Sequence, residues 1–365
     1  MAKYIYEYKN WTNFSWRETD INAIFGEVRN LQGKIIGQMN MLGFKTKEEA
    51  KLTTLTLDVI KSSEIEGEKL DYDQVRSSIA RRLGINIAGL VSANRNVEGV
   101  VEMMLDATQN YQKPLTNKRL FGWHSALFPT GHSGMHKIEV GRYRKGEMQI
   151  VSGAMGKEKI HYEAVTASSV KEEMDKFLKW FNNNSPLDPV LKSAIAHFWF
   201  IIIHPFDDGN GRIARAISDL MLSRADKTTE RYYSMSSQIL IERKKYYEIL
   251  QKVQYSNGDI TDWLDWFLNC LKNSIIATEV NLQKILRKTD FWKIHENTEF
   301  NERQRLVLNK MFDGFEGKLK SSEWAKIAKC SPDTALRDIK GLIDKGILQQ
   351  EKQGGRSTNY ELSDF

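Results

Sequence analysis

Apolar side chains recur every three to four residues along most of this chain, which is the period of an α-helix that buries one face. Strands, in which side chains alternate with a period of two, are expected only in a few short segments. Only six prolines occur among the 365 residues, so few positions would interrupt a helix. We therefore expect a mainly α-helical protein with two or three globular units.

The apolar pattern divides the chain into four parts. We expect an N-terminal helical domain over residues 1–95, a central domain over 96–275, a helical linker over 276–300 and a C-terminal domain over 301–365. Helices in the first three parts are expected at residues 21–43, 47–66, 96–109, 116–127, 170–182, 190–203, 212–224, 241–255 and 278–295.

Composition indicates a reduced, cytoplasmic setting. The longest apolar stretch, residues 196–203, is too short to span a membrane, and the charged residues 1–11 do not resemble a secretory signal. Cys270 and Cys330 lie far apart and have no CxxC partner, so we expect reduced thiols. The net charge of +6 tolerates anionic partners without requiring them. We expect no contact with a membrane.

A loop suited to binding an anion is expected directly after the helix at 190–203. Pro205 disfavours helical geometry at His204, so the helix should end there and a tight loop should follow. Gly209 and Gly211 flank Asn210 just before the next helix. The backbone N–H groups of such a loop can converge on one anion, at the positive end of the helix dipole.

Charged side chains around this loop complete a phosphate site. Arg212 and Arg215 lie three residues apart in the first turn of the next helix, so both guanidinium groups can reach one anion. Asp208 offers the oxygen ligand that Mg²⁺ prefers, and His204 can accept a proton near neutral pH. A buried stripe on the opposite side should leave the arginine face of this helix free, and it consists of Ile213, Ile217, Leu220 and Met221.

The segment 204–215 closely resembles the Fic family motif, His-x-Phe-x-Asp/Glu-Gly-Asn-Gly-Arg-x-x-Arg, and matches it at every fixed position. Doc-like kinases of the family have lysine in place of the second glycine, so Gly211 favours nucleotidyl transfer. The resemblance implies a general base at His204, a Mg²⁺ ligand at Asp208, a core anchor at Phe206, a phosphate cradle at Gly209, Asn210 and Gly211, and phosphate clamps at Arg212 and Arg215.

The activity that this resemblance implies is protein adenylylation. A Ser, Thr or Tyr hydroxyl of a target protein, or of the chain itself, would attack the α-phosphate of ATP in the presence of Mg²⁺, and His204 would remove the proton. Removal of AMP from a target, or transfer of another nucleotide or of phosphocholine, would use most of the same residues. A transcriptional regulator that only senses nucleotide is the alternative of another class.

An inhibitory segment is expected at the end of the helix at 47–66, where Gly67 should stop the helix. Its apolar stripe turns polar at Ser62 and Glu66, and a buried carboxylate needs a cationic partner; a frayed helix end in solvent is the alternative. Residues 62–67 resemble the family's inhibitory motif, Ser/Thr-x-x-x-Glu-Gly/Asn. The resemblance implies that Glu66 pairs with Arg215 and misplaces the γ-phosphate. The stripe consists of Leu52, Leu55, Val59, Ser62 and Glu66.

One hairpin is expected between Met148 and Tyr162, with strands at 148–151 and 159–162 joined across Gly153 and Gly156. By resemblance it is the flap on which a target protein docks by strand addition, and an ordinary surface hairpin is the alternative. The Gly-x-x-Arg sequence at 141–144 fits the family's lead into this flap.

The adenine pocket is expected after the catalytic helix. Residues 243–250 resemble the family segment that closes over the adenine, which places Tyr247 and Gln254 near the base, although core packing is the more frequent role of such an aromatic pair. His124 and His197 lie in apolar segments and should be hydrogen-bonded core residues. We expect no metal at His132 and His136, because the neighbouring glycines oppose the helix that would align them.

The C-terminal domain resembles a winged helix-turn-helix, with helices at 303–311, 321–329 and 333–345 and strands at 348–351 and 359–361. Its third helix could enter a DNA major groove with a face that contains Thr334, Arg337 and Lys340. Residues 301–365 contain 12 Lys and Arg against 10 Asp and Glu, which is a thin excess for a strong DNA binder. Protein docking or dimer contacts are the alternatives.

Overall fold

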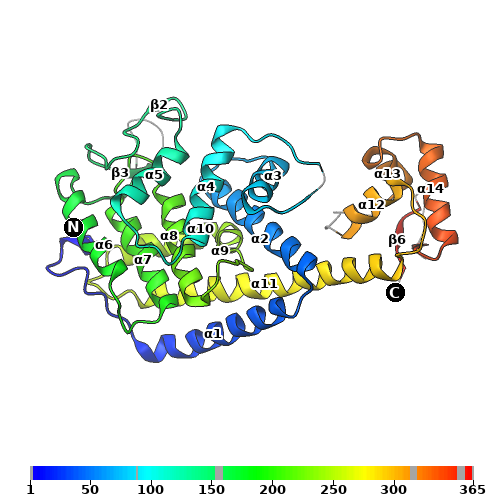
Figure 1. The fold of residues 1–365 in the computed structure, drawn as a ribbon. Coiled ribbons are helices and arrows are strands. Elements are labelled where there is room, and N and C mark those ends of the chain that lie inside the picture. The colour runs from blue at the N-terminus through cyan, green and yellow to red at the C-terminus, as the bar shows by residue number, and fades with distance from the viewer. Residues whose placement is uncertain (1–2, 88, 153–158, 313–318, 352–357, 364–365) are drawn as a thin grey trace. The chain divides into compact units, whose positions relative to one another are not determined.

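Helices dominate the chain, as the apolar period predicts, in a computed structural model that describes residues 3–87, 89–152, 159–312, 319–351 and 358–363 (Figure 1). Contacts divide the chain into two compact units. Unit 1 is Met1–Thr278 and unit 2 is Glu279–Phe365. The domain boundaries expected at residues 95, 275 and 300 stay predictions, because two domains can pack into one compact unit.

Four helices form the N-terminal part of unit 1. They are α1 (Glu18–Asn40), α2 (Phe44–Ile65), α3 (Tyr72–Leu83) and α4 (Arg95–Gln109). Sequence analysis missed α3 because this helix contributes mostly polar side chains, although its ends carry recognisable signals. The side chain of Asp71 accepts a hydrogen bond from the Gln74 N–H, and Gly84 ends the helix in the left-handed conformation.

The central pair of unit 1 is α7 (Pro189–Ile203) packed against α8 (Asn210–Asp226). From Val190 to Ile203, α7 is buried apart from a half-buried Leu191, which explains its long apolar sequence. Around this pair lie α5 (Asn117–Leu127), α6 (Val170–Asn182), α9 (Met235–Ile241), α10 (Arg243–Val253) and the start of α11 (Thr261–Ile294), with short 3₁₀ turns η1 (Ile5–Glu7) and η2 (Ala167–Ser169).

Helix α11 begins well before the expected residue 278. Its first part is apolar on most sides and therefore lacks a clear one-sided period; Trp263, Trp266 and Phe267, for example, are all buried. Figure 1 shows α1 running along α11, and an ion pair of 3.4 Å between Lys272 and Glu27 joins the two helices. The short α9 was also missed, and its Ser234 cap would have been the signal.

Two antiparallel strand pairs complete unit 1. The expected hairpin is confirmed as β3 (Gln149–Ser152) paired with β4 (Lys159–Glu163), with a register shift between Ile150 and Val151. Gly153 and Gly156, the expected turn, lie outside the described residues. The second pair is β1 (His132–Ser133) with β2 (His136–Lys137), so these histidines do not share a helix, as expected.

A buried polar network joins α1, α2 and α8 to the segment before α9. Arg231 donates to Asp219 at 2.6 Å, and its side chain is 3% exposed while that of Asp219 is 1% exposed. Asp58 of α2 accepts from the Ser234 hydroxyl at 2.5 Å. Gln32 of α1 donates to Asp226 at 2.8 Å. These bonds link α1, α2 and α8 to or through the segment before α9, and they give the Asp219 carboxylate a cationic partner in Arg231.

Unit 2 contains the end of α11, then α12 (Glu302–Phe312), α13 (Ser321–Ile327), α14 (Pro332–Asp344) and an antiparallel pair of β5 (Leu348–Gln350) with β6 (Tyr360–Leu362). Leu308, Trp324 and Ile339 are part of its separate hydrophobic core. The order of three helices and two strands follows the expectation for this domain. Its identification as a winged helix stays a prediction.

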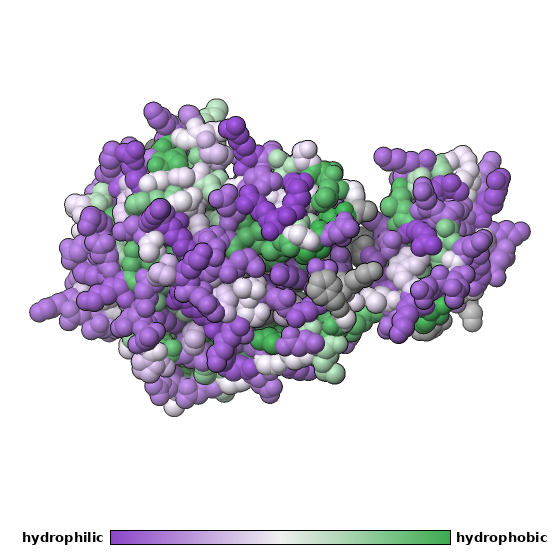
Figure 2. Space-filling view, in the orientation of Figure 1, coloured by the Kyte–Doolittle hydropathy of each residue, from purple (hydrophilic) through white to green (hydrophobic). Residues whose placement is uncertain are grey.

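Most of the visible surface is hydrophilic, with smaller hydrophobic areas between (Figure 2). Among the described ranges, no helix combines the length and apolar character needed to cross a membrane. Cys270 is buried and Cys330 is half-buried, and both are free thiols.

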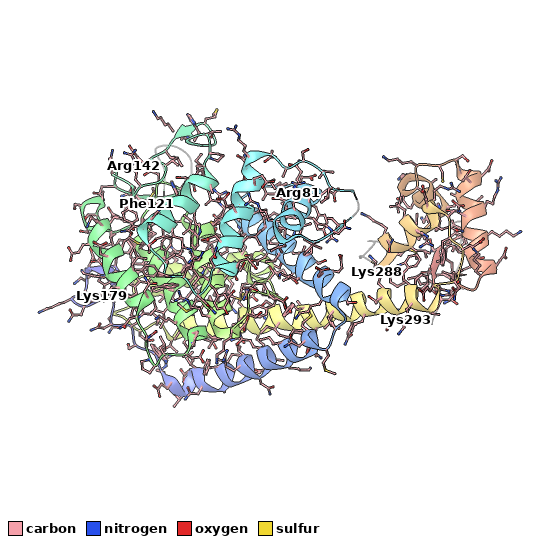
Figure 3. The ribbon with its side chains drawn as sticks, in the orientation of Figure 1. Arg81, Phe121, Arg142, Lys179, Lys288 and Lys293 are labelled. Carbon is pink, nitrogen blue, oxygen red and sulfur yellow. The ribbon has the colours of Figure 1, made fainter. Side chains whose placement is uncertain are left out.

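The buried network generates a prediction about stability. Arg231→Ala should lower the free energy of unfolding by about 3–5 kcal/mol, because Asp219 would remain buried without its cation. Arg142→Ala is the matched control, since Arg142 lies at the surface (Figure 3), is 60% exposed and pairs with Glu139 at 3.2 Å. Exposed pairs contribute about 0–1 kcal/mol. Chemical denaturation measures both, and equal losses would contradict the assigned role of the network.

Candidate active site

The loop between α7 and α8 has two left-handed residues. Helix α7 ends at Ile203, as Pro205 predicts, and His204 adopts φ 49° and ψ 61°. Gly209 precedes α8 with φ 79°, a conformation that glycine adopts without strain. The first N–H groups of a helix have no intrahelical acceptor, and among the described residues no side chain caps α8, so these groups can face an anion.

Side chains from other elements hold this loop in place. Arg144 donates through its Nε to the His204 carbonyl at 2.8 Å, and its backbone N–H donates to the Pro205 carbonyl at 2.9 Å. The Asn210 amide bridges both backbone groups of Phe206, accepting from N–H at 3.0 Å and donating to the carbonyl at 2.8 Å. Asn210 therefore braces the loop through its side chain.

Phe206 is fully buried, as expected of a core anchor. The ring of His124 stacks on it with centroids 4.3 Å apart. His124 lies 3.2 Å from the Asp208 carbonyl through Nε2 and accepts the Gly141 N–H at 3.1 Å through Nδ1. His124 is thus a hydrogen-bonded core residue, as expected, but its contact with the loop was missed, as was that of Arg144.

His204 is arranged to act as a base. Its ring is half-buried, and Nδ1 lies 3.3 Å from the Ile201 carbonyl. A carbonyl can only accept, so Nδ1 carries the proton and Nε2 keeps its lone pair. Burial lowers the pKa of His204 to about 4, so the ring is neutral at pH 7.

Asp208 is half-buried and keeps both carboxylate oxygens hydrogen-bonded. One oxygen accepts the Gly209 N–H at 2.5 Å and the other accepts the Ser133 hydroxyl. Within the part of the chain that the structure describes, no three His, Cys, Asp or Glu side chains gather as a metal cluster. Mg²⁺ bound to a nucleotide needs only one or two carboxylates beside the phosphates, and Asp208 fits that requirement.

The end of α2 brings two carboxylates to α8. Gly67 adopts φ 84°, its N–H donates to the Glu64 carbonyl and the Glu68 N–H donates to the Ser63 carbonyl, both at 3.0 Å. These two bonds define a Schellman turn, which requires the left-handed conformation that glycine provides. The turn confirms the helix stop expected at Gly67. It presents Glu66 and Glu68 on either side of that glycine.

Glu66 forms an ion pair with Arg215. Its Oε1 accepts from Arg215 Nη2 at 2.8 Å. Ser62 contributes its hydroxyl to Arg215 Nε at 2.9 Å and its carbonyl to Nη2 at 2.8 Å. Burial is the largest effect on the pKa of Arg215 and lowers it, but Glu66 together with Tyr246 and Tyr247 raises the pKa above its ordinary value. The alternative of a frayed helix end in solvent is therefore wrong.

Arg212 forms the second ion pair of the site, which the sequence analysis did not predict. Its Nη1 donates to Glu68 Oε2 at 2.6 Å, and its guanidinium lies 5.1 Å from the centre of the Phe128 ring. The arginine face of α8 is therefore not free, contrary to our expectation, because the end of α2 covers it. The side chain of Arg212 is 7% exposed and that of Arg215 is 2% exposed.

Each motif arginine keeps one unused donor. Arg212 Nε and Arg215 Nη1 are buried and have no hydrogen-bond acceptor among the described residues. Buried polar groups are normally satisfied, so these two N–H positions point to a missing acceptor. Gly211 leaves room for the Glu66 carboxylate, because a Cβ there would lie 2.2 Å from Glu66 Oε1 and 3.2 Å from Arg215 Nη1.

The expected adenine residues lie on α10. Tyr247 is 43% exposed, with the Arg243 guanidinium 5.7 Å from its ring centre, whereas the neighbouring Tyr246 is buried and contacts His197 at 2.9 Å. Burial raises the pKa of Tyr247, and the negative charge of Glu66 raises it further. Gln254 is buried at the C-terminal end of α10, about 10 Å farther along the helix axis. Tyr247 is thus within electrostatic range of Glu66.

The expected flap connects directly to the α7–α8 helix pair. Tyr162 of β4 is buried, and its hydroxyl donates to the Ile202 carbonyl of α7. Arg144 donates to the Val165 carbonyl just after β4 as well as to His204. The hairpin is therefore anchored to the same backbone segment that presents the His204 ring.

Comparisons with known proteins agree with this geometry. Residues 114–222 match the family model described as the Fic/DOC family, and residues 4–85 match that of a domain of unknown function, DUF4172. The protein named protein adenylyltransferase Fic from Nematostella vectensis is 23% identical over 223 residues, which are 59% of this chain and 47% of that protein. Its namesake from Drosophila yakuba is 25% identical over 217 residues, 58% of this chain and 39% of that protein. The chain thus spans less than half of either relative.

Two crystal structures share the fold. A Fic family protein from Desulfovibrio desulfuricans G20 superposes with a TM-score of 0.54 at 20% identity and covers 96% of this chain and 98% of its own. A Fic domain containing signaling protein from Bacteroides thetaiotaomicron VPI-5482 gives a TM-score of 0.51 at 20% identity, covering 74% of this chain and 97% of its own.

The environment of His204 generates a prediction about pH. Its imidazole resonances should show no titration between pH 7 and pH 5 in the folded protein, whereas the urea-unfolded chain should titrate near 6.5. The pKa of His204 is lower in the folded protein than in the unfolded chain, so the stability that its neutral form contributes is present above pH 6.5 and is lost as the pH falls toward 4. Between pH 7 and pH 5 this loss is at most about 2 kcal/mol. A folded-state midpoint near 6.5 would contradict the neutral state assigned to the half-buried His204.

Proposed function

We propose that the chain, whose residues 114–222 match the Fic/DOC family model, is a protein adenylyltransferase that moves AMP from ATP to a Ser, Thr or Tyr hydroxyl of a target protein. The observation that carries this proposal is the pair of unused, buried N–H donors on Arg212 and Arg215. They lie at the N-terminus of α8, where a helix favours anions. A neutral His204 precedes them in the same loop.

In the proposed reaction, Nε2 of His204 accepts the proton of the target hydroxyl as its oxygen bonds to the α-phosphorus of ATP. The bond from that phosphorus to the bridging oxygen breaks, and pyrophosphate leaves. The first N–H groups of α8, together with Arg212 and Arg215, would bind the phosphates and stabilise the charge that develops on them. Asp208 would hold Mg²⁺, whose charge would offset that of pyrophosphate.

We further propose that Glu66 restrains the enzyme. Glu66 is bound to Arg215. In the Fic family, which this sequence resembles, the corresponding arginine holds the γ-phosphate. ATP would therefore bind in a less productive position while Glu66 keeps this contact. The contact is between an arginine that is 2% exposed and a carboxylate that is 32% exposed. Release of Glu66 would therefore expose Arg215 to the nucleotide without requiring α2 to unfold.

The partners follow from the same scheme. The β3–β4 hairpin would dock a target protein, or another segment of this chain in self-modification, by strand addition. Tyr247 would lie near the adenine, since it is 43% exposed and within electrostatic range of Glu66. DNA binding by residues 301–365 rests on the exposed Arg337 and Lys340 of α14 and remains a subordinate proposal.

His204→Ala tests the base. Transfer of AMP should fall by about 10² to 10⁴-fold, while ATP binding persists, because the phosphate contacts remain. Label should reach protein from ATP labelled at the α-phosphate and not from ATP labelled at the γ-phosphate. Label from the γ-phosphate alone would indicate a kinase, and specific DNA binding with no transfer to any protein would favour the regulator instead.

Glu66→Gly tests the restraint. The initial rate of AMP transfer should rise at least tenfold relative to the unmodified chain, because Arg215 loses its competing carboxylate. Glu66→Gln should raise the rate in the same direction, which separates loss of charge from the added backbone freedom of a second glycine beside Gly67. Equal rates in all three proteins would dismiss the restraint.

A further inference from the structure

A second carboxylate competes with nucleotide in this site. Resting on the proposed function, we propose that Glu68 occupies the phosphate position of Arg212, so that the end of α2 masks both motif arginines at once. The contact is short, 2.6 Å from Arg212 Nη1 to Glu68 Oε2. Because it joins a guanidinium group to a carboxylate, the hydrogen bond is charge-assisted.

The Schellman turn at Gly67 explains how one short segment reaches both arginines. Glu66 is the last residue before the glycine, and Glu68 is the first after it. The left-handed Gly67 reverses the chain between them, so that Glu66 pairs with Arg215 and Glu68 with Arg212. Arg212 and Arg215 are three residues apart on α8 and thus lie on one face. Two carboxylates therefore stand where two phosphates would bind.

The contact is built to be displaced. Glu68 touches Arg212 through a single hydrogen bond, and Arg212 Nε stays buried without an acceptor among the described residues. A single bond gives less energy than the paired contacts that a phosphate can make with a guanidinium group. The carboxylate of Glu68 is 34% exposed, whereas Arg212 is 7% exposed. Departure of Glu68 into water would thus leave a preformed, buried cation for the nucleotide.

The experiment measures binding rather than turnover. The dissociation constants of ATP and ADP with Mg²⁺ are determined by calorimetry for the unmodified chain, Glu68→Gln and Glu68→Ala. Both substitutions should lower the dissociation constants roughly five- to tenfold, because nucleotide no longer displaces a carboxylate from Arg212.

Glu64→Gln is the matched control. Glu64 belongs to the last turn of α2 and pairs with Lys61 at 2.7 Å, so the same loss of charge should leave nucleotide affinity unchanged. Unchanged affinity in both Glu68 variants, with nucleotide still bound, would overturn this inference and leave the proposed function standing. Absence of nucleotide binding in every variant, Glu66→Gly included, would overturn the proposed function itself.

Discussion

Two buried guanidinium groups on α8 are the constraint that the site depends on. A buried cation is costly unless an anion compensates it, and here the compensation comes from Glu66 and Glu68 at the end of α2. The arginines are enclosed by protein while their carboxylate partners reach solvent. Under the proposed function, the arginines would be the fixed part of the site and the carboxylates the exchangeable part, because a phosphate can offer the same guanidinium groups several acceptors.

This exchange requires that α2 itself stays in place, and the buried network around Arg231 provides the support. Asp58 on α2 bonds to the segment before α9, while Asp219 on α8 holds Arg231. Asp58 therefore ties the middle of α2 to the segment that also holds Asp219 of α8, whereas the end of α2 contacts Arg215 through Ser62. Under the proposed restraint, a movement confined to the end of α2 would release the arginines without breaking the bonds around Arg231.

Much of the fold and site could be predicted from sequence because the signals are local. Pro205 marks the end of α7, Gly67 marks the end of α2, and the three-residue spacing of Arg212 and Arg215 fixes their common face. The missed features depend on contacts between distant segments. Arg144 reaches the His204 carbonyl across 60 residues of sequence, and no periodicity reports such a contact.

The pairing of Glu68 with Arg212 is another contact between distant segments that no local sequence signal predicts. A solvated arginine face on α8 was the natural expectation from its apolar stripe, because one-sided burial is the usual state of an amphipathic helix. In the structure both faces of α8 are buried instead. Carboxylates at the end of α2 pair with the two arginines and offset the free-energy cost of burying their charge. A helix face with two arginines at three-residue spacing can thus be a buried face when a glycine-stopped helix elsewhere ends in two nearby acidic residues. Both features together, and neither one alone, indicate that the end of α2 covers the arginine face of α8.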